Sequence, residues 1–404
     1  MLTARDLFEG LVGRRTGIIR DLALAETIDG DAPLVHAGVE IANAHPSLGG
    51  EHLRAGGAGL TRDDAIVSAI CEGVERYAAS SHPPHDHLGA IFGCRRSLGA
   101  RALDPASFAR FSDRQRALPS FPFARATDDT HLRWVEGVDL ATGEPRLVPA
   151  FAVHLPYLPA RGEPAIDGGI STGLACARSA PEAIARATRE IIERDALALL
   201  FLRGEPPARV DAREVDAIAR DLLPPRDRVS VFDVTTDVGV PVIFVLCVGE
   251  GPRGQLVSVG AACDPDPERA LRKAAMEASQ DRVYVRLLVE DDPAWKPHAD
   301  FSNVVDFSRH ARLYSADPVL ARRGLFDWID RGPTVTLARS RAKTLTFGGA
   351  AVDLTPPWAA ALGLHVARVV VPELVPLHGN HLLRYEGHPR LGASPLWPYP
   401  HPMP

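Results

Sequence analysis

Three long stretches of the chain carry apolar residues at helical spacing and contain few glycines or prolines. The first covers residues 61–80 and begins at Thr61 with Asp64 three positions later, which is the spacing of a capping box. The second covers residues 179–203, with Ser179 as its N-cap and Gly204 directly after its end. The third covers residues 266–290 and has prolines near its start, where a helix tolerates them. The pattern predicts three long helices.

Shorter runs rich in β-branched residues lie between and after these helices. They cover residues 228–235, 240–249, 256–263 and 364–372, and turn residues bound each of them. Such strands combined with long helices predict an α/β or α+β fold, in which sheets pack against the helices. A length of 404 residues is compatible with two or three domains or with one large domain.

Composition and charge argue against two classes of partner. The 45 Lys and Arg residues against 51 Asp and Glu give a net charge of -6, so no overall positive field attracts nucleic acid. No apolar run reaches the roughly 18 residues that a membrane span needs, and we therefore expect a protein of the cytoplasm.

Five cysteines without a C-x-x-C pair predict neither a disulfide framework nor a zinc knuckle. The histidines at positions 82, 85 and 87 depart from zinc-site spacing and are interpreted as a solvated loop.

The main clue to function is a string, E-x-x-E-R, that occurs in both the first and the second predicted helix. Its members are Glu72, Glu75 and Arg76 in one helix and Glu190, Glu193 and Arg194 in the other. Residues i and i+3 share one face of a helix, so each string sets two carboxylates side by side among apolar neighbours. Carboxylates held close in a poorly hydrated place repel each other unless a cation lies between them. Two such pairs facing each other can hold Mg²⁺ ions that bridge a polyphosphate, and the arginines can contact the remaining phosphate charge.

A surface role is the alternative, because E-x-x-E-R also occurs on exposed helices, where Glu and Arg form weak ion pairs. The third predicted helix, however, carries Glu277 and Gln280 at the same i, i+3 spacing. Related strings on three apolar helices favour a shared site, and duplication of half the chain is one explanation of the repeat. The sequence contains no G-x-x-x-x-G-K-[ST] string, so a nucleotide is not held in the P-loop manner.

The combination of these motifs resembles the YcaO-domain family, from Thr16 to the last residue. The segments 59–77, 171–196 and 263–282 resemble the three ATP-site helices of that family. The resemblance implies a single domain over residues 1–404, with a YcaO-like fold of internally repeated halves in which β-sheets and long helices surround an ATP site. It implies that ATP and Mg²⁺ serve to activate a backbone amide of a peptide. The implied metal ligands are Glu72, Glu75, Glu190 and Glu193, and the implied nucleotide contacts are Ser68, Arg76, Glu182, Arg194, Glu277, Gln280 and Arg282.

Position 58 departs from the family pattern. Relatives commonly carry a lysine in a G-K-G-L-T string, where this chain has Ala58 between two glycines. One expected phosphate-facing cation is therefore missing. Compensation by Arg54 or Arg62, dependence on a partner protein and weaker ATP binding are the alternatives.

The proline-rich segment 388–404 ends on P-H-P-M-P, which fits the P-x-P-x-P ending of the azoline-forming branch of the family. Alternating prolines form a stiff, extended chain that can deliver its terminal carboxylate to a fixed place. The alternative is a disordered end. We expect Trp397 and Tyr399 to anchor this tail and the carboxylate of Pro404 to act as a catalytic proton acceptor.

The resemblance implies a cyclodehydratase that makes thiazoline or oxazoline rings from Cys, Ser or Thr residues of a ribosomal precursor peptide. Because the family domain accounts for nearly the whole chain, leader recognition is assigned to a separate E1-like or ThiF-like partner protein. A homodimer is also compatible with the sequence. Formation of a thioamide or an amidine, and a non-catalytic scaffold for a partner enzyme, remain as alternatives. The peptide substrate and the ring type are not distinguished.

Overall fold

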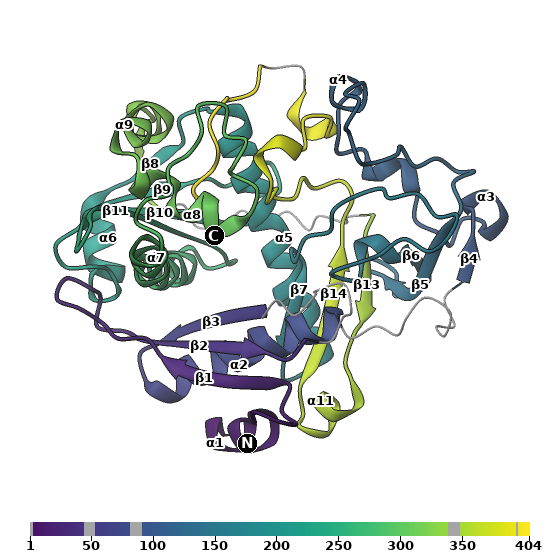
Figure 1. Cartoon of the computed structure of the whole chain (residues 1–404), viewed down its shortest axis with the longest axis horizontal. Helices are drawn as coiled ribbons and strands as arrows, with labels where there is room; N and C mark the ends of the chain where they lie inside the picture. Colours follow the sequence, from purple (N-terminus) through teal and green to yellow (C-terminus); the bar gives the residue numbers. More distant parts are fainter. Residues whose placement is uncertain (1–2, 44–52, 81–90, 338–347, 393–394) are drawn as a thin grey trace.

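The computed structural model describes residues 3–43, 53–80, 91–337, 348–392 and 395–404. Its strands form three sheets grouped around a long central helix, α5 (Ala180–Arg203) (Figure 1). The sheet orders are β1-β2-β3, β11-β10-β9-β8-β12 and β4-β5-β13-β14-β7, and β6 lies beside β5. Among the described strands, every pairing is antiparallel except that of β12 with β8.

The three sheets come from different parts of the chain. The three-stranded sheet contains β1 (Ile19–Leu24), β2 (Val35–Ile41) and β3 (Leu53–Gly59). The five-stranded sheet contains β8 (Ala208–Val210), β9 (Arg228–Asp233), β10 (Val242–Gly251), β11 (Gly254–Cys263) and β12 (Thr334–Val335). The remaining sheet contains β4 (Ile91–Gly93), β5 (Leu132–Asp139), β6 (Pro145–Pro149), β7 (Leu174–Ala177), β13 (Ala350–Asp353) and β14 (His365–Val370).

The three predicted helices are confirmed to within one residue, as α2 (Arg62–Ser80), α5 and α7 (Pro267–Asp291). The Oγ1 of Thr61 accepts a hydrogen bond from the Asp64 N–H, and Ser179 and Asp266 cap α5 and α7. The other helices are α1 (Ala4–Leu11), α3 (Arg95–Leu98), α4 (Asp113–Arg116), α6 (Ala212–Ala219), α8 (Phe307–Ala316), α9 (Pro318–Ala321), α10 (Asp327–Ile329) and α11 (Pro357–Ala361).

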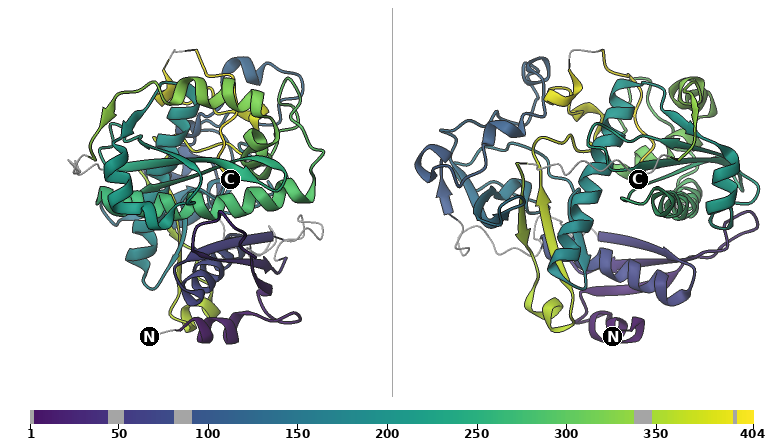
Figure 2. Two further views of the ribbon diagram at one scale, coloured as in Figure 1. Left: turned by 90° about the vertical axis from the view of Figure 1, so that its left-hand side faces the viewer. Right: turned by 180° about the vertical axis from the view of Figure 1, so that it is seen from behind.

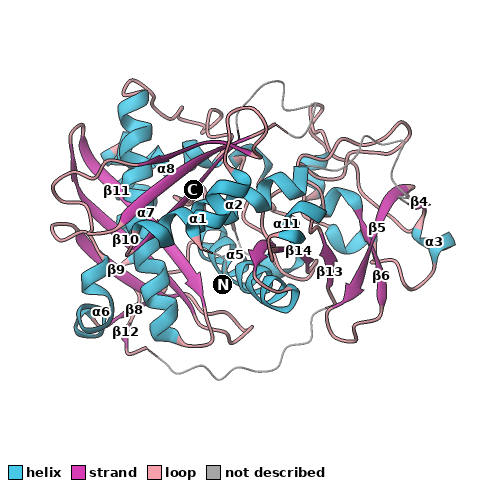
Figure 3. Ribbon diagram, turned by 90° about the horizontal axis from the view of Figure 1, so that it is seen from below, coloured by secondary structure: helices cyan, strands magenta, loops and turns pink. Residues whose placement is uncertain are grey.

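The architecture repeats a strand followed by a long helix three times. In each unit the helix packs against the strand that precedes it: α2 on β3, α5 on β7 and α7 on β11. Seen from behind and from below, α5 runs through the middle of the molecule, and α2 covers one face of the three-stranded sheet (Figures 2 and 3). The mixed α and β fold predicted from the sequence is therefore confirmed, and the repeat has three units where the E-x-x-E-R string revealed two.

Glycines bring two of these strands unusually close to their helices. A Cβ atom on Gly57 of β3 would lie 2.3 Å from the Ala69 backbone nitrogen of α2. A Cβ atom on Gly260 of β11 would lie 2.3 Å from both the Ala274 oxygen and the Ala278 nitrogen of α7. Only glycine permits this approach, and it brings the strand backbone within reach of helix side chains.

Helix α5 is apolar on all sides over residues 196–202, because it packs against strands of both larger sheets. No helix among the described residues is long and apolar enough to cross a membrane.

A buried ion pair fixes α5 to the C-terminal segment. Asp195 is fully buried and accepts hydrogen bonds of 2.8 Å from both Nε and Nη2 of Arg390. Replacing Arg390 by leucine leaves this carboxylate without its counter-charge, and we expect a loss of about 3 kcal/mol in the free energy of unfolding. Urea denaturation measures the loss. Asp237→Asn is the control, since it removes the exposed partner of the same arginine and should cost less than about 1 kcal/mol; equal losses in both variants would contradict the prediction.

Candidate functional site

The first acidic residue of each helical string is held by the strand of its own unit. A backbone N–H of that strand donates a hydrogen bond to one carboxylate oxygen of the glutamate. The bonds run from Gly56 to Glu72 (3.1 Å), from Gly173, just before β7, to Glu190 (3.0 Å), and from Ala261 to Glu277 (3.4 Å). The same contact therefore recurs in all three units and fixes three carboxylates relative to the sheets.

The second glutamate of each E-x-x-E-R string reaches the strand of the next unit. Glu75 of α2 accepts a 2.6 Å hydrogen bond from the Cys176 N–H of β7. Glu193 of α5 is bonded by the backbone of Cys263 at the end of β11, which acts to lower its pKa. These contacts bring the acidic faces of α2, α5 and α7 together. We call Glu72, Glu75, Glu190, Glu193 and Glu277 the carboxylate cluster.

Burial and mutual repulsion perturb the carboxylate cluster. Loss of hydration raises the pKa of Glu75 and Glu193 well above the usual range, and neighbouring negative charges raise it further. For Glu75 these charges are Glu72 and Glu190, so the pairs from α2 and α5 lie within electrostatic reach of each other. Glu277 keeps contact with solvent, yet the surrounding protein removes enough of its hydration to raise its pKa to about 7.

Two arginines lie among these acids. Arg76 Nη2 is 2.7 Å from Glu72 Oε1, and Arg194 Nε is 3.5 Å from Glu193 Oε1. Burial alone would lower the pKa of Arg194, but the surrounding carboxylates outweigh this effect and raise it. The cluster therefore contains more carboxyl groups than these two guanidinium groups can pair with.

The donor set of the carboxylate cluster fits Mg²⁺. Mg²⁺ prefers oxygen ligands and is bound in proteins by a few carboxylates together with phosphate oxygens and water. The backbone bonds orient the carboxylates in advance, and a bound cation would relieve the repulsion between them. Glu72, Glu75, Glu190 and Glu193 would hold the ions, as expected from their spacing.

The structure brings some of the expected nucleotide contacts to this place. A Cβ atom on Gly56 would lie 3.1 Å from Gln280 Nε2, so the Gln280 amide of α7 lies against the β3 backbone that holds Glu72. Ser68 is exposed on α2, one turn before Glu72. Glu182 lies two turns before Glu190 on α5, about 12 Å along the axis, and forms an exposed 2.6 Å ion pair with Arg186.

The resemblance implies that Arg282 contacts the nucleotide, but the structure places its side chain away from the carboxylate cluster. Its side chain is only 2% exposed, and it donates hydrogen bonds to Asp227 (2.7 Å), Asp31 (3.2 Å) and the Glu250 carbonyl (2.9 Å). The spacing explains the difference. Arg282 follows the first glutamate of its helix by five residues, whereas Arg76 and Arg194 follow theirs by four, and one residue turns a side chain by about 100° around a helix. Arg282 binds α7 to neighbouring loops and does not face the carboxylate cluster.

Sequence reasoning missed Arg368 on β14. It is buried and donates to the carbonyls of Ala152 (2.9 Å), Ser171 (2.9 Å) and Ile170 (2.8 Å). Its positive charge lowers the pKa of Glu190, although burial leaves that pKa raised overall. The sequence contained a signal for this residue, because an arginine inside an apolar strand must have buried polar partners.

The alternation of buried and accessible residues along β3 shows which face a lysine at position 58 would occupy. Ala55, Gly57 and Gly59 are buried, while Gly56 and Ala58 lie on the opposite face, on which Gly56 meets Gln280. Ala58→Lys would therefore place its ammonium group on the α7 side, and we expect ATP binding to tighten by somewhat over tenfold, the effect of one charge-assisted contact. Calorimetric titration with ATP and Mg²⁺ measures this. Unchanged affinity would mean that another cation already fills the place, and Arg54→Gln in the native chain would then weaken binding.

The end of the chain follows a fixed course past α5 and α8 (Figure 1). The backbone N–H of Trp397 donates to the Leu202 carbonyl of α5 (2.8 Å), and the Tyr314 hydroxyl donates to the Pro400 carbonyl (2.6 Å). The ring of Trp397 lies 5.5 Å from Trp328. The segment 400–403 is buried, whereas Pro404 is exposed. The expected anchoring of the tail is thus confirmed, and the catalytic role of Pro404 remains a prediction.

Comparisons with known proteins identify the family to which the chain is similar. The model of the YcaO family, described as a YcaO cyclodehydratase that binds ATP and Mg²⁺, matches residues 56–375. An uncharacterized protein of Methanothermobacter thermautotrophicus is 31% identical over 64% of this chain, and the match covers 63% of its own length. An uncharacterized protein of the tfuA 3' region of Rhizobium leguminosarum bv. trifolii is 26% identical over 81% of this chain and 78% of its own length.

Solved structures share the fold. A heterocyclase in complex with substrate and cofactor superposes with a TM-score of 0.71 at 19% identity, covering 99% of this chain and 57% of the other. The YcaO protein of Methanopyrus kandleri bound with AMPPCP and Mg²⁺ gives 0.59 at 22% identity over 88% and 86% of the two chains. The E. coli microcin synthetase McbBCD complex gives 0.62 at 15% identity over 94% and 96%.

The family match begins within β3 and includes the other two strand–helix units, α2 and the whole carboxylate cluster. The expected cofactors, ATP and Mg²⁺, are those in the description of the family. With its fold and the matched residues in agreement, the chain belongs to the YcaO family.

Proposed function

We propose that this protein is an ATP-dependent cyclodehydratase that forms thiazoline or oxazoline rings in a ribosomal precursor peptide. The observation that carries the choice among YcaO reactions is the tail, whose P-x-P-x-P sequence is buried and hydrogen-bonded up to Met403. An enzyme that uses its C-terminal carboxylate needs a tail fixed in this way, whereas a scaffold without activity does not.

The proposed reaction removes one water from the peptide. The thiol or hydroxyl of a Cys, Ser or Thr residue attacks the carbonyl carbon of the preceding residue and forms a five-membered hemiorthoamide. Its oxygen then takes the γ-phosphoryl group of ATP, and ADP leaves. Loss of inorganic phosphate and of the amide proton completes the azoline. Phosphorylation is needed because hydroxide is a poor leaving group and phosphate is a good one.

The residues of this chain would chiefly position charge. Glu72, Glu75, Glu190 and Glu193 would hold Mg²⁺, which supplies neutralisation of the phosphate charge during transfer. Arg76 and Arg194 would contact phosphate oxygens, and Gln280 would contact the nucleotide from α7. The carboxylate of Pro404 would accept the proton of the reacting amide.

We also propose that an E1-like or ThiF-like partner binds the leader of the peptide. Support comes from the structural neighbours, since one was solved as the McbBCD complex with pro-MccB17 bound. A site for the leader is not needed in the part of this chain that we describe.

Mass spectrometry of candidate precursor peptides tests the reaction. The peptides are incubated with the protein, its partner, ATP and Mg²⁺, and their N-termini are acetylated so that no amidine can form there. The proposal expects a product lighter by one water for each modified Cys, Ser or Thr, and none when that residue is alanine. Exchange of oxygen for sulfur would establish thioamide formation, and consistently unchanged peptide with every candidate would favour a scaffold.

A further inference from the structure

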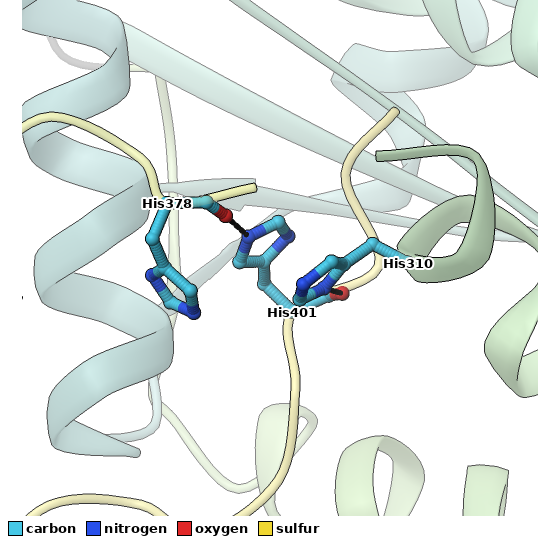
Figure 4. A group of neighbouring side chains, drawn as sticks. All are labelled: His310, His378 and His401. Atoms are coloured by element: carbon cyan, nitrogen blue, oxygen red, sulfur yellow. Dashed lines mark hydrogen bonds between the residues drawn. The ribbon is translucent and has the colours of Figure 1, made fainter. Parts of the chain in front are cut away.

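Three buried histidines from distant parts of the chain meet beneath the tail (Figure 4). His310 lies on α8, His378 on the segment after β14, and His401 in the P-H-P-M-P ending. They are at most 2% exposed, and one ring nitrogen from each of them lies within 4.8 Å of those of the other two. The mechanism proposed above uses none of these residues.

Hydrogen bonds determine where two of the rings carry their lone pairs. His310 Nδ1 lies 2.8 Å from the His401 carbonyl, and His401 Nε2 lies 2.7 Å from the His378 carbonyl. A carbonyl only accepts, so both nitrogens are N–H donors. In a neutral ring this leaves a lone pair on His310 Nε2 and on His401 Nδ1, and the second accepts a weak 3.2 Å bond from the Met403 N–H. Metal-binding histidines show this pattern, in which the other ring nitrogen donates to a carbonyl.

The third ring is unpaired. Neither nitrogen of His378 has a hydrogen-bond partner within the described residues, nor has Nε2 of His310. Burying such groups without partners is costly, and a function at this place accounts for them. Burial also lowers the pKa of His310 to about 4 and holds those of His378 and His401 well below the usual value. Burial thus favours the neutral imidazole, which is the form that binds metals.

We propose that His310, His378 and His401 bind a divalent transition-metal ion, with Zn²⁺ as the best match to an all-imidazole site. Tetrahedral Zn²⁺ with bonds of about 2.0–2.1 Å separates its ligand atoms by roughly 3.4 Å. One nitrogen of each ring lies within 4.8 Å of the others, so the rings must move closer together. The rings of His310 and His401 are stacked, with centres 3.9 Å apart, so one must turn until its lone pair faces the ion. His401 Nδ1 would then exchange the Met403 N–H for the metal.

A fourth ligand is at hand. Nδ1 of His381 has no hydrogen-bond partner among the residues that the structure describes, and the ring centre of His381 lies 6.2 Å from that of His378 and 6.3 Å from that of His310. The low exposure of the site leaves little access for a substrate, which identifies the ion as structural. Because His401 is three residues before Pro404, the ion would fix the tail to α8 and to the segment after β14.

Zinc binding by the untagged, chelator-treated protein tests the proposal without ATP, Mg²⁺ or peptide. We expect one equivalent of Zn²⁺ by elemental analysis after gel filtration, and competition with a chromophoric chelator gives the affinity. His378→Phe keeps an aromatic ring of similar size but no ligand atom. It should weaken binding by more than the roughly 10- to 100-fold that loss of an outer-shell partner costs. His310→Gln is the second variant and should behave alike.

Two controls separate this site from other zinc ligands. Replacing the histidines at positions 82, 85 and 87 by glutamine should leave the affinity unchanged; these residues lie outside the described part of the chain. Glu190→Gln should also leave it unchanged. No zinc bound by the native chain, or zinc lost in either control but kept in His378→Phe and His310→Gln, would overturn the proposal. Because the measurement involves no turnover, its failure would leave the proposed cyclodehydratase activity untouched.

Discussion

Glu190→Gln should reduce ATP turnover by more than about 100-fold and leave the protein as stable as before, or more stable. A direct ligand to the metal should cost more than the roughly 10- to 100-fold that loss of an outer-shell partner costs. The amide oxygen of glutamine can still accept the Gly173 N–H, so the anchor to the unit's strand survives. The substitution also removes a carboxyl group whose pKa is raised by burial. It thereby removes the repulsion that Glu190 exerts on Glu75.

Phosphate release measures the turnover, and thermal melting in the absence of nucleotide measures the stability. The control is Glu268→Gln, which neutralises an exposed glutamate in the first turn of α7, outside the carboxylate cluster. A merely structural Glu190 would give the opposite signature, with a lower melting temperature and turnover that falls only in proportion to unfolding.

Adding one residue after Pro404 should suppress peptide cyclisation far more than ATP binding. The tail is buried as far as Met403 and hydrogen-bonded to Tyr314 at Pro400, so an added residue cannot be absorbed by slack and moves the carboxylate by about 3.1 Å. A misplacement of 1 Å in an active site can already cost on the order of a hundredfold. The residues assigned to ATP lie on α2, α5 and α7, and their geometry stays as it is.

Cyclised product and ATP affinity are measured side by side for the native and the extended chain. The same residue added before Met1 is the matched control, since it changes length and mass but not the tail. If the extended chain cyclises peptide at the native rate, the Pro404 carboxylate is not the proton acceptor, and equal losses of cyclisation and ATP affinity would show a general disturbance instead.

The long helices could be predicted because their boundaries are local. A capping side chain and an apolar period are decided within a few residues, so α2, α5 and α7 appear in the sequence almost as they appear in the structure. Strand β3 could not be found in this way. Its sequence, LRAGGAG, has the glycines that let α2 approach, and those glycines hide the alternation that marks a strand.

The sequence could predict which glutamates form the carboxylate cluster but not which backbone groups hold them. Spacing on a helix reveals that Glu72 and Glu75 share a face, but it does not reveal that Cys176 will donate to Glu75. Arg282 shows the opposite limit, because its partner Asp31 is 251 residues away in the chain. Contacts between distant segments depend on how the sheets pack, and a single amino-acid sequence reveals little about that packing.

The bonds of Glu75 and Glu193 to the strand of the next unit affect how the protein folds during its synthesis on the ribosome. The Cys176 N–H that bonds Glu75 is made 101 residues after it. At roughly 5–20 residues per second, α2 waits about 5–20 s for this partner, and α5 waits in turn for β11. The nascent chain therefore has no nucleotide site until the third unit emerges, and ATP cannot assist the folding of the first two units. Once the site is complete, a nucleotide that binds it stabilises all three units together.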